Sequence, residues 1–258
     1  KGIRKILVKI IGLRAYLKLV SKSYLLLIKM GFLHKEYPEL LFLYKLVKPT
    51  DNVIDIGANL GYYSKQIKKI QKGSTGALLA VEPIPLFASV WKSNVGESEQ
   101  VRLENSALGS TNETVRMGIP IVDGVVRHGL TKVIEKGDDH SNTREYDVQM
   151  KIGDEVVDSW NKDRIHFVKC DVEGYEQFVI PNLKETILKN FPIFQIELGG
   201  IENRENVVQF LINLNYEIYI LSEMKLTQIN QSQIFDMDQD FYFIHSDNKS
   251  NHLELIHN

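Results

Sequence analysis

Cysteine is almost absent from this 258-residue sequence, which contains only Cys170. A single cysteine excludes an intrachain disulfide framework and fits a reducing compartment such as the cytoplasm. The sequence also lacks an uncharged apolar run of about 18 residues, so it predicts no transmembrane helix. Its seven histidines show no metal-type spacing such as H-E-x-x-H. We therefore expect a cytoplasmic protein that holds no metal ion.

Acidic side chains are missing from residues 1–35, which carry nine Lys or Arg. The remaining residues, 36–258, include 22 basic and 33 acidic side chains. A body of this acidity repels phosphates, which argues against a nucleic-acid partner.

The basic segment predicts an amphipathic helix over residues 3–30, interrupted near Gly12 and capped by Gly31. Lysines and arginines recur four residues apart on its stripes, with Ile and Leu between them. Two interpretations stay open. In the first interpretation, residues 1–30 contact an anionic membrane surface, which would make the protein membrane-associated. Alternatively they pack their apolar side on the domain and leave the lysines in water, and we favour this second interpretation.

A short apolar run at residues 53–56 has the length of a buried parallel strand and ends at Gly57. A helix is predicted directly after it, over residues 59–70. A strand that turns on glycines into a helix presents backbone N–H groups to a ligand. Gly57 and Gly61 let the backbone approach that ligand closely, and Asp55 brings a carboxylate to the same crevice.

The spacing Gly57-x-x-x-Gly61 fits neither the dinucleotide fingerprint G-x-G-x-x-G nor the G-K-[ST] of a P-loop. A carboxylate beside the turn suits a ligand with an ammonium or sulfonium group better than a pyrophosphate. We interpret this turn as a cofactor-binding site.

Carboxylates also follow two later strands. The run 77–81 predicts a buried strand that ends at Glu82, which is 25 residues after Gly57 and near the separation typical of a ribose-binding acid. The strand predicted over 165–170 ends at Asp171, with Glu173 close behind. Glu173 would also favour a helix N-terminus through the helix dipole, whereas Asp171 has the stronger functional case.

Residues 113–152 contain several short β-type runs and predict an insertion that supplies a lid or substrate wall. His128 lies in this insertion and is a candidate base. Two late strands, predicted over 216–221 and 241–245, suit an antiparallel hairpin at one sheet edge. The polar tail, residues 247–258, is expected to be poorly ordered.

Two strings resemble the FkbM family of S-adenosylmethionine-dependent methyltransferases. They are Asp55-Ile-Gly-Ala-Asn-Leu-Gly-Tyr-Tyr-Ser64 and Lys169-Cys-Asp-Val-Glu-Gly-Tyr-Glu176, with Val81-Glu-Pro-Ile-Pro85 in support. The resemblance implies an α/β, Rossmann-like class I methyltransferase fold: a seven-stranded, mostly parallel sheet with an antiparallel edge hairpin and helices on both faces. We expect an N-terminal helical extension over residues 1–47 and the methyltransferase domain over 48–246.

The resemblance also implies the site. S-adenosyl-L-methionine would be bound by Asp55, Gly57, Ala58, Asn59, Gly61, Tyr63, Ser64, Glu82, Pro83, Ser106, Ala107 and Asp171. The catalytic candidates are Asp171 first, then Glu173 and His128. A divalent ion shared by Asp171, Glu173 and Glu197 is an open alternative.

The implied activity is O-methylation of a hydroxyl on a sugar, glycan or natural product, in which a carboxylate or His removes the hydroxyl proton. Two alternatives remain. One is a nicotinamide-dependent oxidoreductase on a similar fold, which the absence of G-x-G-x-x-G disfavours. The other is a catalytically silent, membrane-recruited binding module. Calorimetry with S-adenosylhomocysteine and with NAD would separate the three.

Overall fold

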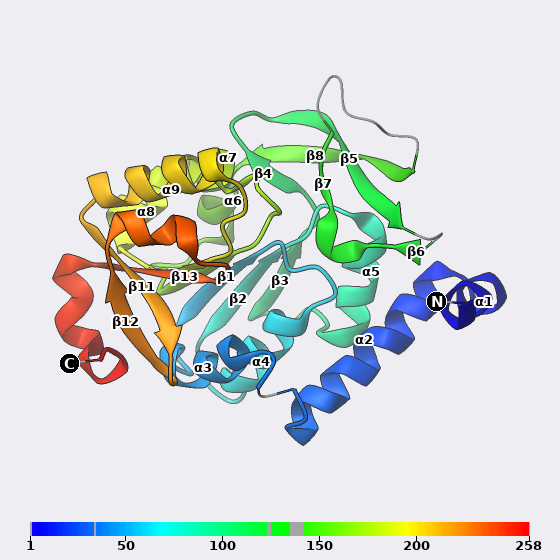
Figure 1. Cartoon of the computed structure of the whole chain (residues 1–258), viewed down its shortest axis with the longest axis horizontal. Helices are drawn as coiled ribbons and strands as arrows, with labels where there is room; N and C mark the ends of the chain where they lie inside the picture. The colour runs from blue at the N-terminus through cyan, green and yellow to red at the C-terminus, as the bar shows by residue number, and fades with distance from the viewer. Residues whose placement is uncertain (1, 34, 123–124, 135–141, 258) are drawn as a thin grey trace.

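The computed structural model describes residues 2–33, 35–122, 125–134 and 142–257, and its centre is an eight-stranded mixed sheet (Figure 1). The order of the strands is β12-β11-β13-β10-β9-β1-β2-β3. From β10 to β3 all neighbours are parallel, whereas β13 is antiparallel to both β10 and β11. The bounds are β1 (Asn52–Ile56), β2 (Ala77–Val81), β3 (Val101–Glu104), β9 (Phe167–Cys170), β10 (Ile193–Ile196), β11 (Tyr216–Ser222), β12 (Lys225–Ile229) and β13 (Phe241–His245).

Helices cover both faces of this sheet because its strands are apolar on both sides. Alternate residues of β1 show the division, since Ile54 and Ile56 enter one core cluster and Val53 enters the other. The first face packs against α6 (Gly153–Trp160), α7 (Glu176–Val179), η2 (Ile180–Leu183), α8 (Lys184–Asn190) and α9 (Ile201–Asn213). The second packs against α3 (Pro38–Leu46), α4 (Tyr62–Ile70) and α5 (Pro85–Asn94) (Figure 1). The predicted class I methyltransferase-like α/β fold is confirmed.

The sheet has one strand more than the seven predicted. β12 pairs with β11 through a tight turn at Glu223 and Met224, both with positive φ. The segment has only five residues, of which Leu226 and Ile229 are buried. So few apolar residues carry too weak a periodic signal to distinguish a strand from a loop.

The insertion and the short strand that precedes it form a second sheet, in the order β4-β8-β5-β6 with β7 paired to β5. Its strands are β4 (Ala107–Gly109), β5 (Glu113–Val122), β6 (Val125–Val126), β7 (Lys132–Val133) and β8 (Thr143–Ile152), and η1 (His128–Leu130) lies between β6 and β7. β5 and β8 pair antiparallel over eight residue pairs. Met117, Ile119 and Met150 from this sheet share a core cluster with Phe87 of α5, so the second sheet is packed onto the main body.

Two helices precede the domain, α1 (Gly2–Ile11) and α2 (Leu13–Met30). The predicted interruption is at Gly12, whose φ is 78°, and Gly31 forms the left-handed C-cap of α2 with φ 83°. α2 runs along α5 (Figure 1), and its Leu17 is buried in the core cluster that includes Phe87. Among the helices of the described residues, none combines the length and apolar character needed to cross a bilayer.

Two details of the predicted packing are wrong. The tail is not a loose segment, because η4 (Ser246–Leu255) ends at the buried Leu255, and the next residue, Ile256, is buried and pairs with Leu226. The sequence after β9 predicts one helix to about Lys189 with Phe178 and Leu188 facing inward, but these two residues are 40% and 43% exposed. The helix there is divided by the 3₁₀ turn η2, and this changes which residues face the sheet.

Candidate active site

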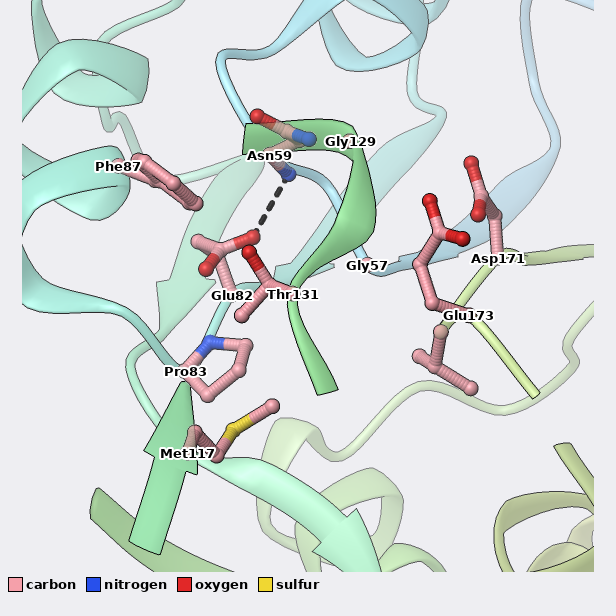
Figure 2. A pocket seen from close by; sticks show the side chains of 11 residues that line it. Gly57, Asn59, Glu82, Pro83, Phe87, Met117, Gly129, Thr131, Asp171 and Glu173 are labelled. Atoms are coloured by element: carbon pink, nitrogen blue, oxygen red, sulfur yellow. Dashed lines mark hydrogen bonds between the residues drawn. The ribbon is translucent and has the colours of Figure 1, made fainter. Parts of the chain in front are cut away.

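A pocket opens at the carboxyl edge of the parallel strands, where β1, β2 and β9 end (Figure 2). Parallel strands end at the same edge, so residues far apart in the sequence meet there. The side nearest β2 carries the apolar side chains of Pro83, Phe87 and Met117 and the carboxyl group of Glu82, and the side nearest β9 carries Asp171 and Glu173. The lining residues are Gly57, Asn59, Glu82, Pro83, Phe87, Met117, Gly129, Thr131, Asp171, Val172 and Glu173.

Glu82 is held at the end of β2 by backbone groups. Its Oε2 accepts a hydrogen bond from the Asn59 N–H at 2.8 Å and its Oε1 accepts one from the Ile84 N–H at 2.8 Å. The residue is 4% exposed, and burial raises the pKa of its carboxyl to about 8 despite these two hydrogen bonds. Each carboxylate oxygen has a second lone pair, so the group can still accept hydrogen bonds from a ligand in the pocket.

Gly57 is required by the neighbouring strand as well as by the pocket. A Cβ at this position would lie 1.8 Å from the carbonyl oxygen of Asp171 and 2.8 Å from its carbonyl carbon. Gly61 has a similar role, since a Cβ there would lie 2.7 Å from Val95 and 2.9 Å from Trp91. The two glycines are expected to let a ligand approach the backbone closely. They also let Asp171, Val95 and Trp91 lie where a Cβ would otherwise be.

We expect Gly57→Ala to destabilise the protein by about 2 kcal/mol or more, because β1 and β9 must separate and the residue keeps an unfavourable φ of 78°. Gly73→Ala is the matched control, since Gly73 has the same φ but open space around its Cβ position. Urea unfolding of both variants measures the difference. Equal losses for the two would show that the contact with Asp171 carries no cost.

Asp171 is joined to a buried lysine beneath the pocket. The Nζ of Lys169 donates to Asp171 Oδ2 at 3.0 Å and lies 4.6 Å from the ring centroid of Tyr63. Lys169 is 3% exposed. Burial by itself would lower its pKa, but Asp171, Asp55 and Asp240 together raise it. The lysine is therefore a buried cation that compensates several carboxylates.

Lys169 belongs to a polar row that crosses the second face of the sheet. In register, Asp55 on β1 stands beside Lys169, which stands beside Gln195 on β10, which stands beside Tyr242 on β13. Gln195 donates to the hydroxyl of Tyr63 at 3.0 Å and also to Asp240. A buried polar group is costly unless it has a polar partner. The row gives the buried Lys169 a polar neighbour on each adjacent strand.

Glu173 stands between the pocket and a second cavity. It has a positive φ of 58°, and both cavities include it in their walls. The second cavity measures about 480 Å³ and is lined by Glu173, Gly174, Gln177, Glu197, Gly199, Gly200, Ile201, Glu202 and Asn203. Burial, reinforced by Asp171 and Glu197, raises the pKa of Glu173 to about 8. Burial and the same aspartate raise the pKa of Glu197 to about 7.

Glu176 has a structural role. It is fully buried, its Oε1 accepts a hydrogen bond from the Val172 N–H at 2.8 Å, and its Oε2 accepts one from Asn203 Nδ2 at 2.6 Å. These bonds fix the loop between Asp171 and α7, and they hold Glu173 at the junction of the two cavities.

Of the residues expected to bind the cofactor or react, six line the pocket. The six are Gly57, Asn59, Glu82, Pro83, Asp171 and Glu173. Asp55 is buried, where it accepts a hydrogen bond from the Ser64 hydroxyl, which in turn accepts one from Trp91 Nε1. Ala58, Gly61, Tyr63, Ser106 and Ala107 are absent from the pocket wall.

His128 begins η1, but its side chain lies outside the described part of the structure. Its neighbour Gly129 lines the pocket, and a Cβ there would lie 4.0 Å from Glu173 Oε1. Among the described residues no group of three His, Cys, Asp or Glu side chains could hold a metal ion, so the alternative of an ion shared by Asp171, Glu173 and Glu197 gains no support.

The insertion, predicted to supply a lid or substrate wall, contributes Met117, Gly129 and Thr131 to the pocket, but the sequence did not single out these three residues. Met117 on β5 and the segment with Gly129 and Thr131 complete its wall, and in Figure 2 that segment passes between Glu82 and Glu173. Phe87 of α5 was also missed. No spacing rule relates these positions to the strand ends, because the second sheet is placed by packing and not by pairing with the first. Lys169 could have been found from the sequence, because a lysine in a strand predicted to be buried needs a charged partner.

The sequence model of the methyltransferase FkbM domain matches residues 55–223. No curated protein matches the sequence significantly.

Several solved structures resemble this one at low identity. The methyltransferase FkbM of Methylobacillus flagellatus KT is 13% identical, with a TM-score of 0.48, over 76% of this chain and 44% of that one. Fibrillarin of Aeropyrum pernix, with bound S-adenosyl-L-methionine, is 11% identical, with a TM-score of 0.45, over 77% of this chain and 68% of that one. TrmK of M. capricolum, in complex with S-adenosyl-homocysteine, is 14% identical, with a TM-score of 0.42, over 80% of this chain and 66% of that one. The chain thus spans less than half the length of the FkbM structure.

Proposed function

The chain belongs to the FkbM methyltransferase family, whose cofactor is S-adenosylmethionine, and from that premise we propose that it methylates a hydroxyl of a sugar, glycan or natural product. The observation that carries the proposal is the position of Glu173, a carboxyl group with a pKa of about 8 at the junction of two cavities. The first cavity would take the cofactor and the second the acceptor.

The residues around the first cavity suit S-adenosylmethionine chemically. Pro83, Phe87 and Met117 offer apolar surface to an adenine ring. Glu82, at the end of β2, can accept hydrogen bonds from ribose hydroxyls. Asp171 brings a carboxylate to the side where an ammonium and a sulfonium group would be stabilised. The side chains that line the first cavity therefore fit the chemical groups of the cofactor.

The segment with Gly129 and Thr131 occupies part of the space between these walls. With it in place the first cavity encloses about 80 Å³, whereas pockets for drug-sized ligands usually enclose about 300–1,000 Å³. We infer that this segment moves outward when a ligand enters and then covers it, as loops over active sites commonly do.

Glu173 would act as the base. S-adenosylmethionine supplies an activated methyl group when bound, and the acceptor hydroxyl must lose its proton as it attacks. Asp171 already accepts a hydrogen bond from Lys169, which makes it the better group for orientation. The raised pKa of Glu173 suits a carboxylate that takes a proton near neutral pH. We therefore propose Glu173 as the base in place of Asp171, which its strand-end position had favoured.

Two measurements test this function. Calorimetry with S-adenosylhomocysteine and with NAD separates a methyltransferase from a nicotinamide-dependent oxidoreductase, and binding of neither would indicate a catalytically silent module. Incubation with methyl-labelled S-adenosylmethionine and a panel of sugars, glycans and polyhydroxylated natural products then identifies the acceptor. Recovery of the label on nitrogen or on RNA instead of a hydroxyl would contradict the proposal.

We expect Glu82→Ala to weaken S-adenosylhomocysteine binding by about 1–3 kcal/mol, the scale of hydrogen bonds to a charged acceptor. The carboxylate form accepts the ribose bonds, so the affinity of the unmodified protein should rise with pH through about 8, and the variant should lose that rise. Calorimetry across pH measures both effects. Glu104→Ala, at the end of the next strand but outside the pocket wall, is the control. A Glu82→Ala affinity within error of the unmodified protein would remove Glu82 from the cofactor site.

A further inference from the structure

The helix α2 is apolar on two opposite faces, of which the domain uses only one. Leu17 and Ile28 on the inner face are 1% and 8% exposed. On the outer face Leu19, Leu26 and Met30 are 51%, 54% and 58% exposed. These three residues are separated by seven and four positions, so they form one stripe along the helix. A helix that served only to cover the domain would have a polar outer face.

A basic stripe runs directly beside the apolar one. At 100° per residue, Arg14, Lys18, Lys22 and Lys29 fall between the inner face and the outer apolar stripe of α2. α1 continues the pattern, with Ile6 and Ile10 at 59% and 73% exposure and with Arg4, Lys5 and Lys9 exposed. The sequence has no Asp or Glu before Glu36, so no acidic side chain of this segment offsets the charge.

We propose that the outer face of α1 and α2 docks on an anionic membrane surface, with the exposed Ile, Leu and Met side chains at the acyl boundary and the basic stripe among the lipid headgroups. Exposed apolar residues flanked by Lys and Arg are the pattern of helices that lie in the membrane interface. A second copy of the chain fits this face poorly, because a symmetric contact would place the basic stripes opposite one another. The interpretation that this segment only packs on the domain accounts for the inner face and not for the outer one.

Point variants test the proposal better than removal of the helices, because Leu17 and Ile28 are part of the core. The assay is sedimentation of the full chain with vesicles of phosphatidylcholine alone or mixed with phosphatidylserine. The apolar variant is Leu19→Gln with Leu26→Gln, and its control is Leu253→Gln on η4, where the leucine is 57% exposed. The charge variant is Lys18→Gln with Lys22→Gln, and its control is Lys184→Gln with Lys189→Gln on α8.

We expect binding to the mixed vesicles only, a steep loss of binding with added salt, and at least about a tenfold loss in each outer-face variant. Both controls should bind like the unmodified protein. Failure to bind phosphatidylserine vesicles at low salt would overturn the proposal. So would equal binding of the variants and controls, or self-association that Leu19→Gln with Leu26→Gln abolishes in the absence of lipid.

Discussion

Replacement of Glu173 by Gln is expected to lower methyl transfer by about 10²–10⁴-fold, the usual range for loss of a general base. Gln keeps the size of the side chain and its hydrogen bonding but cannot take the proton. The affinity for S-adenosylhomocysteine should change little, because the lost interaction is made during transfer. In the unmodified enzyme kcat/KM for the acceptor should rise as the pH rises through about 8, where Glu173 loses its proton.

Asp171→Asn is the matched comparison for this variant, since both carboxylates line the same cavity. The test is kcat and KM over a pH series, with the acceptor identified in the panel, together with calorimetry for the cofactor. If Asp171 is the base instead, Asp171→Asn will remove the pH-dependent rise and Glu173→Gln will preserve it. Loss of cofactor binding in Glu173→Gln would make Glu173 a cofactor ligand.

Replacement of Lys169 by Met is expected to destabilise the protein by about 3–5 kcal/mol, the cost of removing one partner of a buried ion pair. The residue is 3% exposed and lies among Asp171, Asp55 and Asp240. Met fills a similar volume, so the loss would come from the uncompensated carboxylates and not from a cavity. Urea unfolding at neutral pH measures the effect.

The pH dependence of Lys169→Met distinguishes this cause from simple misfolding. Burial already raises the pKa of Asp55, and Lys169 opposes that rise. A carboxyl group whose pKa is raised in the folded state stabilises the fold below its unfolded pKa and loses that contribution as pH rises. The variant should therefore recover stability relative to the unmodified protein as the pH is lowered. Lys151→Met is the control: the Lys151 side chain is 44% exposed, and its partner Glu104, 11% exposed, keeps an ion pair with Arg102, so the loss should be about 0–1 kcal/mol. Equal losses for the two lysines would contradict the role of burial.

The pocket residues that could be predicted from the sequence share one property, which is their position directly after a parallel strand. Gly57, Glu82 and Asp171 follow β1, β2 and β9, and the ends of parallel strands share one edge whatever the loops between them do. Asp55 looked equivalent but is the fourth of the five residues of β1, inside the sheet, where it faces Lys169 and Ser64 and not the pocket.

Local pattern and chain order by themselves determined the fold class, the family resemblance and the strand-end carboxylates of this protein, because apolar runs, glycine turns and motif spacing are properties of short segments. Only the tertiary structure decided which groups share an environment. Burial next to other carboxylates raises the pKa of Glu173, the register of β1, β9 and β10 places Lys169 between Asp55 and Gln195, and packing of the second sheet brings Gly129 beside Glu173. Packing of α2 along α5 and the domain likewise divides the apolar residues of α2 between a core face and an exposed one. Desolvation and proximity depend on neighbours that are distant in the sequence, and no local pattern contains them.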